Sequence, residues 1–192
     1  MPSFQPFAIQ LIREDHEALT TVLTALRDVV ESACRSGRTP DFDDVRAMLF
    51  YLDEMPARMH HASENELLFP KIRERCPVLH PVLDRLEAEH ERGESSVREL
   101  AHALTAWEVM GDVHRESFQL MLRTHSTIYL GHMQVEESYV LPVAADYLSP
   151  ADWRELAEAL TRQRNDTDPS MTQGHRALFA RIRTYPAPQK RP

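Results

Sequence analysis

The sequence predicts an all-α protein: an antiparallel, up-down four-helix bundle followed by a short helical extension. Four long segments carry apolar residues at alternating steps of three and four positions, which is the pattern of helices packed in a bundle. Short connections separate these segments, so consecutive helices should run antiparallel. The chain has only 5 glycines among 192 residues, which favours long helices over a turn-rich β fold.

The four helices are expected at about residues 7–34, 41–70, 81–109 and 113–147. Breaks at residues 36–40 and 111–112 contain the glycines and the proline that commonly end helices. Pro56 lies inside the second segment. Because proline removes a backbone donor, we expect it to bend or loosen that helix one turn before His60.

A different pattern begins after Leu148, and we divide the chain into a bundle domain, 1–148, and a helical extension with a tail, 149–192. Ser149 is a good helix cap and Pro150 suits the first helical position, so a helix should run from there to about Arg164. A loop should follow at 165–169, then a short helix at about 173–182. Residues 186–192 are expected to be disordered.

Charge and composition exclude several function classes. The net charge of −8 argues against nucleic acid as a partner, since phosphate binding needs a basic surface. No apolar run approaches the ~20 residues of a membrane span, and the N-terminus does not resemble a signal peptide. Cys34 and Cys76 form no zinc or redox motif. We therefore expect a reduced, cytoplasmic protein that is a monomer or a homodimer.

Two copies of a His-x-x-x-Glu motif stand out, His60 to Glu64 and His132 to Glu136, each followed by apolar residues and a proline. Residues four apart lie on one helix face, roughly 6 Å from each other, so each copy presents an imidazole beside a carboxylate. The first and third helices carry His16 and His90 at core positions of their apolar seams. Every helix of the bundle thus contributes a core histidine.

Such a set of buried polar groups requires a partner, because each unpaired group costs a few kcal/mol. Six ligands are too many for one zinc ion, and calcium and magnesium prefer oxygen throughout. Imidazole with carboxylate suits iron or manganese. We therefore predict a dinuclear centre, two iron ions with manganese or zinc as alternatives, that keeps open positions for a small molecule. The predicted ligands are the terminal His16, His60, His90 and His132 and the bridging Glu64 and Glu136.

These motifs together resemble the hemerythrin-like proteins, also called HHE cation-binding domains. The resemblance covers roughly residues 7–146 and implies a helical bundle holding a non-haem diiron site that binds dioxygen, nitric oxide or related ligands. Two positions depart from the pattern: Glu94 stands where the oxygen-carrying members of the family have a fifth histidine, and Asn65 replaces the usual glutamate. Glu94 could ligate, accept a hydrogen bond or face solvent, whereas Asn65 falls off the seam and should be harmless. The motifs are residues 13–16, 56–64 with 68–70, 89–93, and 132–142.

Other polar residues receive weaker predictions. His61 should lie at the surface or around the ligands rather than ligate, and His125 should be a core or channel residue. Tyr129 could donate a hydrogen bond to a bound ligand or simply pack. Asp15 and Glu87 could orient the ligand imidazoles. The remaining histidines are expected at the surface: His80, His102, His114 and His175.

Three functions are compatible with such a centre. The leading hypothesis is a protein that binds dioxygen or a related molecule for sensing, storage or delivery. The alternative is a diiron enzyme that responds to nitric oxide or peroxide, or a protein that repairs iron–sulfur clusters. The third is a regulatory module in which occupancy of the metal site alters contacts of the 149–184 extension.

Overall fold

The computed structural model describes residues 4–55, 60–165, 169–182 and 184. Across these residues the chain is helical and contains no strand, which confirms the predicted all-α class. The helices of the bundle are α1 (Phe4–Arg35), α2 (Phe42–Met55), α3 (His61–Ser63), α4 (Phe69–Arg75), α5 (His80–Met110), α6 (Arg115–Val135) and α7 (Leu141–Tyr147).

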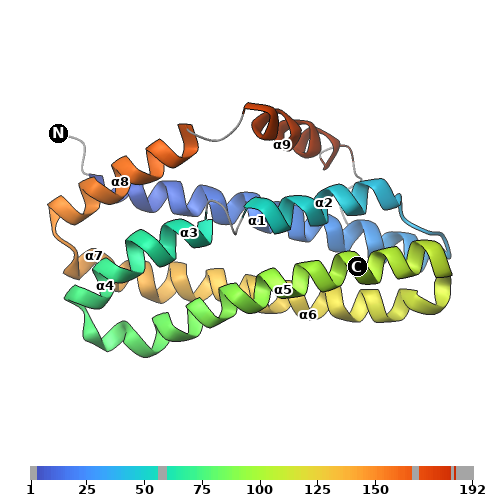
Figure 1. Ribbon diagram of the computed structural model, residues 1–192, viewed down its shortest axis with the longest axis horizontal. Helices are drawn as coiled ribbons and strands as arrows, with labels where there is room; N and C mark the ends of the chain where they lie inside the picture. Colours follow the sequence, from blue (N-terminus) through green and yellow to red (C-terminus); the bar gives the residue numbers. More distant parts are fainter. Residues whose placement is uncertain (1–3, 56–59, 166–168, 183, 185–192) are drawn as a thin grey trace, which may run out of the picture.

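These helices form four long arms that run side by side along the molecule (Figure 1). The arms are α1, then α2 continued by α3 and α4, then α5, then α6 continued by α7. Neighbouring arms pack in the order α1–α2, α2–α5, α5–α6 and α6–α1. Short 3₁₀ turns, η3 (Pro77–Leu79) and η4 (Asp112–His114), reverse the chain before α5 and α6. The predicted four-helix bundle is confirmed.

Two arms are interrupted by π-helical turns that the apolar pattern did not reveal. They are η2 (Glu64–Leu68) and η5 (Glu136–Val140), and each begins at a predicted metal ligand. In each, the glutamate carbonyl accepts a hydrogen bond from the N–H five residues later. Pro70 and Pro142 each lie two residues after the end of such a turn. A proline ring collides with the carbonyl four residues before it, and that carbonyl lies inside the widened turn.

The apolar core consists of two clusters. One contains Leu19 to Val30 of α1 with the facing parts of α2, α5 and α6. The other contains Ala8 to Ile12 of α1 with α4, α7 and the start of α5. His16 lies between the two clusters on α1, and His90 lies between them on α5. The predicted ligands therefore form a polar layer across the middle of the bundle.

The extension folds back on the bundle (Figure 1). Helix α8 (Pro150–Asn165) lies along α1, and its Trp153 and Leu156 join the second apolar cluster. Helix α9 (Pro169–Ile182) covers α1 and α2, with Leu178 in the first cluster. It begins four residues earlier than predicted. The Ser149 cap is present: its backbone N–H and hydroxyl donate to Asp152, and its hydroxyl accepts from the Asp152 N–H.

Two predictions, a bend at Pro56 and a disordered tail at 186–192, lie outside the described residues. Within the part of the chain that the structure does describe, no helix has the length and hydrophobicity to cross a bilayer.

Candidate metal centre

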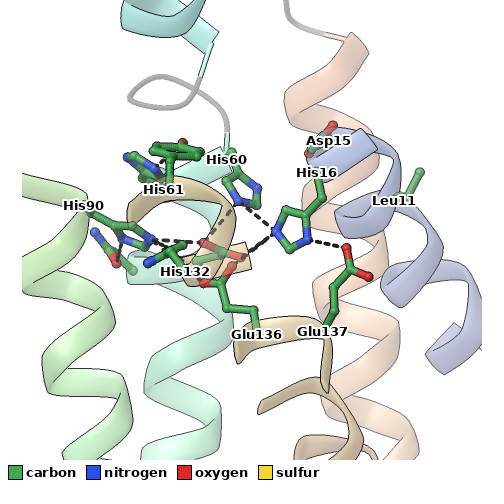
Figure 2. A network of polar contacts seen from close by, with 12 residues as sticks. Leu11, Asp15, His16, His60, His61, His90, His132, Glu136 and Glu137 are labelled. Atoms are coloured by element: carbon green, nitrogen blue, oxygen red, sulfur yellow. Dashed lines mark hydrogen bonds and ion pairs between the residues drawn. The ribbon is translucent and has the colours of Figure 1, made fainter. Parts of the chain in front are cut away.

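The structure brings all six predicted ligands together in the central polar layer. Figure 2 shows the four ligand histidines and Glu136 turned toward one another. Each side chain is buried, with at most 3% of its surface exposed. They form two groups of four potential ligands, and within each group the ligand atoms lie within 4.8 Å of one another. Both groups contain Glu64 and Glu136. The first adds His16 and His60, and the second adds His90 and His132.

In the first group the imidazoles of α1 and the second arm face each other. The Nε2 atoms of His16 and His60 are 3.1 Å apart. Nε2 of His16 lies 3.2 Å from Oε2 of Glu136, and Nε2 of His60 lies 3.5 Å from Oε2 of Glu64. Two imidazole nitrogens and two carboxylates therefore converge on one small volume.

The second group repeats this arrangement with α5 and α6. The Nε2 atoms of His90 and His132 are 2.9 Å apart. Nε2 of His90 lies 3.4 Å from Oε2 of Glu64, and Nε2 of His132 lies 3.1 Å from Oε1 of Glu136. The two oxygens of Glu136 thus face different groups, which is the placement that a bridging carboxylate requires.

The donor set fits a bound cation. Oε2 of Glu64 and both carboxylate oxygens of Glu136 are fully buried and have no hydrogen-bond partner among the described residues. Buried carboxylate oxygens without donors are costly, and native proteins rarely leave them so. A cation between the carboxylates and imidazoles supplies the missing partner for all three oxygens.

The acid–base state of the layer also suits cation binding. Burial disfavours the charged form of His16, but the adjacent Glu136 carboxylate outweighs it, and the pKa rises to about 9. At His132, too, the Glu136 carboxylate outweighs the effect of burial and raises the pKa to about 9. Burial lowers the pKa of His60 well below its usual value and that of His90 to about 4. Protons therefore occupy two positions that a metal ion would take.

The two glutamates shift in opposite directions. Burial, together with the neighbouring Glu136 carboxylate, raises the pKa of Glu64 well above its usual value. Burial also favours the neutral form of Glu136, but the adjacent His132 and His16 imidazoles, whose Nε2 atoms lie 3.1 and 3.2 Å from its oxygens, lower its pKa well below the usual value. Without a metal, the layer thus holds one ionised carboxylate between two imidazolium groups.

The sequence profile of the hemerythrin HHE cation binding domain matches residues 8–144. The chain belongs to this family. The resemblance inferred from the motifs is thereby confirmed, and cation binding, the property that names the domain, fits the two groups of His and Glu side chains. A search of curated proteins finds no significant match.

Three ligand histidines of this HHE domain have their outer nitrogen held by a polar neighbour. Nδ1 of His16 donates to Glu137 over 2.8 Å, as Figure 2 shows, and Nδ1 of His132 donates to Glu89 over 3.0 Å. Nδ1 of His90 donates to Oδ1 of Asn65 over 2.9 Å. These bonds fix the rings with Nε2 turned inward.

Sequence reasoning assigned this orienting role to other residues. Asp15 instead accepts a hydrogen bond from Arg164, and Glu87 accepts one from Arg73. Asn65 was expected to be harmless because it falls off the seam, but it contacts His90 directly. That the replacement of glutamate by Asn65 is harmless stays a prediction. The sequence offered one signal for the residues that orient the imidazoles. Asn65 directly follows the ligand Glu64, and Glu137 directly follows the ligand Glu136.

His61 is buried against the centre rather than at the surface. Its ring stacks on that of His90, with centroids 3.9 Å apart and planes 14° from parallel. Burial raises the pKa of Tyr129 well above its usual value, so the hydroxyl keeps its proton and donates to Nε2 of His61 over 2.8 Å. Nδ1 of His61 then faces Glu94 at 3.3 Å. Of the three alternatives for Glu94, the structure shows hydrogen bonding.

The five remaining histidines differ in burial. His125 is buried, as predicted for a core or channel residue, and His102 is exposed. Three others are half-buried rather than at the surface. Of these, His80 contacts the carbonyl oxygen of Arg73, and His175 packs on Tyr51; the third is His114.

Proposed function

We propose that the chain holds two iron ions bridged by Glu64 and Glu136, and that this diiron centre binds dioxygen or a related small molecule such as nitric oxide. The observation that carries the proposal is the sharing of both glutamates by the two groups of ligands. Each ion would receive two imidazoles and two carboxylates. Iron, which accepts more than four ligands, would keep open positions for a small molecule, whereas zinc is typically saturated by four.

The biological role that we propose is sensing, storage or delivery of that small molecule in the cytoplasm. The charge of −8 supports a role without nucleic acid. We place the protein away from membranes and propose a monomer or a homodimer.

Metal content and spectrum test this proposal. The protein reconstituted anaerobically with ferrous iron should contain about two iron ions per chain, the number set by the two groups of ligands. A visible charge-transfer band should appear with air and disappear on degassing. His90→Ala should lose iron, whereas His102→Ala, an exposed position on the same helix, should retain it. One zinc per chain with no iron would overturn the proposal.

A second candidate is a diiron enzyme that acts on peroxide or nitric oxide. The hydrogen-bonded row of Tyr129, His61 and Glu94, in which His61 stacks on His90, favours it because such a row can relay a proton near the proposed ions. Iron–sulfur cluster repair is a related alternative. Irreversible bleaching with turnover of peroxide or nitric oxide, in place of a reversible band, would identify the enzyme.

A further inference from the structure

A cavity of about 290 Å³ opens between α5 and α6 and ends at the metal centre. His90 and His132 form its inner end, and Gly93 and Tyr129 form its walls. Exposed residues of both helices surround its mouth, among them Ile128, which is 53% exposed. The cavity therefore connects solvent with two of the proposed iron ligands.

The outer part of this cavity carries a polar group that the metal centre does not use. His125 is 4% exposed, and its Nδ1 lies 3.2 Å from the hydroxyl of Ser96. Its Nε2 is buried and has no hydrogen-bond partner among the described residues. Burial lowers the pKa of His125 to about 4, so the imidazole is neutral at neutral pH. A neutral imidazole can donate or accept at Nε2, according to the tautomer that Ser96 selects.

His125 lines the cavity that leads to the metal centre, but it lies too far from the centre to bind a metal ion there. It precedes His132 by seven positions, about 10 Å along the helix axis. The Tyr129 ring stands between them, with its centroid 5.6 Å from that of His125 and 6.1 Å from that of His132. Opposite Tyr129, α5 presents Gly93, where even a Cβ atom would lie 3.6 Å from the tyrosine ring. Since Gly93 lines the cavity, a side chain longer than that Cβ would fill the passage between His125 and the metal centre.

We propose that this cavity is a docking site in which His125 holds a small, neutral molecule that donates and accepts hydrogen bonds, of the size and chemistry of hydrogen peroxide, before it reaches the metals. The proposal rests on the diiron centre proposed above. A neutral imidazole provides no countercharge for an ion, whereas it satisfies a hydroxyl group well. Dioxygen and nitric oxide are weak hydrogen-bonding partners and would gain little from His125.

Hydrogen peroxide is the probe for two measurements. The first titrates peroxide into the full-length protein, in its metal-free and zinc-loaded forms, and follows the ring ¹⁵N signals of His125. These signals should shift saturably and return when catalase removes the peroxide. His125→Leu should weaken the binding about fivefold, the loss expected for one hydrogen bond, as read from backbone amides around the cavity.

The second measurement is the rate at which hydrogen peroxide oxidises the reduced, iron-loaded protein. Gly93→Leu fills the passage and should slow this reaction at least about tenfold, as expected when binding at a site is blocked sterically. Gly131→Leu is the matched control, because Gly131 is exposed on α6, outside the cavity, and has no atom within 4 Å of its Cβ position. Iron content is measured for both variants.

The two proposals fail separately. Failure to bind metal overturns the diiron centre, and the His125 signals still report on the cavity. If iron binds normally, an unshifted His125 signal overturns the docking site. Equal peroxide rates in Gly93→Leu and Gly131→Leu overturn it as well.

Discussion

Neighbours of the ligand histidines, as well as the ligands themselves, determine how this centre is built. Glu137, Asn65 and Glu89 each accept a hydrogen bond from the Nδ1 of a different ligand histidine. Two of these neighbours are carboxylates, which increase the basicity of the imidazole, whereas Asn65 is a neutral amide that only orients His90. Among these three ligands, His90 is therefore oriented by a hydrogen bond without an added negative charge.

Asn65→Ala isolates this orienting effect. Without its acceptor the His90 ring is free to rotate, so the affinity for metal should fall about tenfold, the lower end of the effect expected for such partners. Competition with a chromophoric chelator measures the change. Glu66→Ala, at the exposed neighbouring position, should bind metal as the wild type does. Equal affinities in the two variants would show that Asn65 contributes nothing to the site.

Proton release should accompany metal binding. Without metal, His16 and His132 carry protons up to a pKa of about 9, and metal ions bind only neutral imidazole. Each ion must displace a proton, so the affinity should rise as the pH increases from about 6.5 and should level off above pH ~9. Calorimetry in buffers of different ionisation enthalpy counts the protons: about two are expected from these imidazoles and about one more from Glu64, whose raised pKa keeps it neutral without metal. An affinity that is flat across this range would contradict the assignment.

At the scale of elements, the sequence predicted the bundle and its core histidines because both depend on periodicity. Buried positions recur every three or four residues, and His16 and His90 occupy such positions. The π-helical turns were missed, since one extra residue in a turn leaves the surrounding apolar pattern almost unchanged. Pro70 and Pro142, each six residues after a ligand glutamate, were the signal that could have located them. The neighbours that orient the imidazoles were missed because their contacts cross between helices.

Helix α8 connects the extension to the metal layer. Arg164, near its end, donates to Asp15, to Glu14 and to the carbonyl oxygen of Leu11 over 2.6–2.7 Å. Asp15 directly precedes His16. Helix α8 thus fixes the turn of α1 that directly precedes the ligand His16. A contact of this kind is expected if the extension has a regulatory role.

Arg164→Ala should destabilise the protein. Burial raises the pKa of Asp15, and the guanidinium that compensates this buried carboxyl would be lost together with two further hydrogen bonds. The free energy of unfolding should fall by about 1–3 kcal/mol, measured by urea denaturation. Arg162→Ala, an exposed position of the same helix, should stay within about 0.5 kcal/mol of the wild type. Equal unfolding midpoints for the two variants would mean that α8 is not anchored through Arg164.

Across the whole molecule, a polar layer divides the core into two apolar clusters. Such a layer contributes little to stability by itself, because Oε2 of Glu64 has no donor and the charges of the layer are removed from water. Metal binding reverses this balance by giving the carboxylates and imidazoles a cation to bind. The stability of the bundle should therefore depend on metal far more than that of a helical bundle with a continuous apolar core.

Thermal unfolding with and without ferrous iron, under anaerobic conditions, tests this dependence. A metal ion present at 100 times its Kd should add about 2.7 kcal/mol, which for a chain of this size raises Tm by about 5–11 °C. Glu64→Leu separates the two contributions to stability. It removes a buried carboxyl whose Oε2 has no donor, so the metal-free variant should be at least as stable as the metal-free wild type. The same variant loses a bridging ligand, so its Tm should no longer rise with iron. The opposite result would be a Glu64→Leu variant that is less stable without metal and still gains stability from iron. It would show that the apolar clusters, and not the polar layer between them, stabilise the bundle.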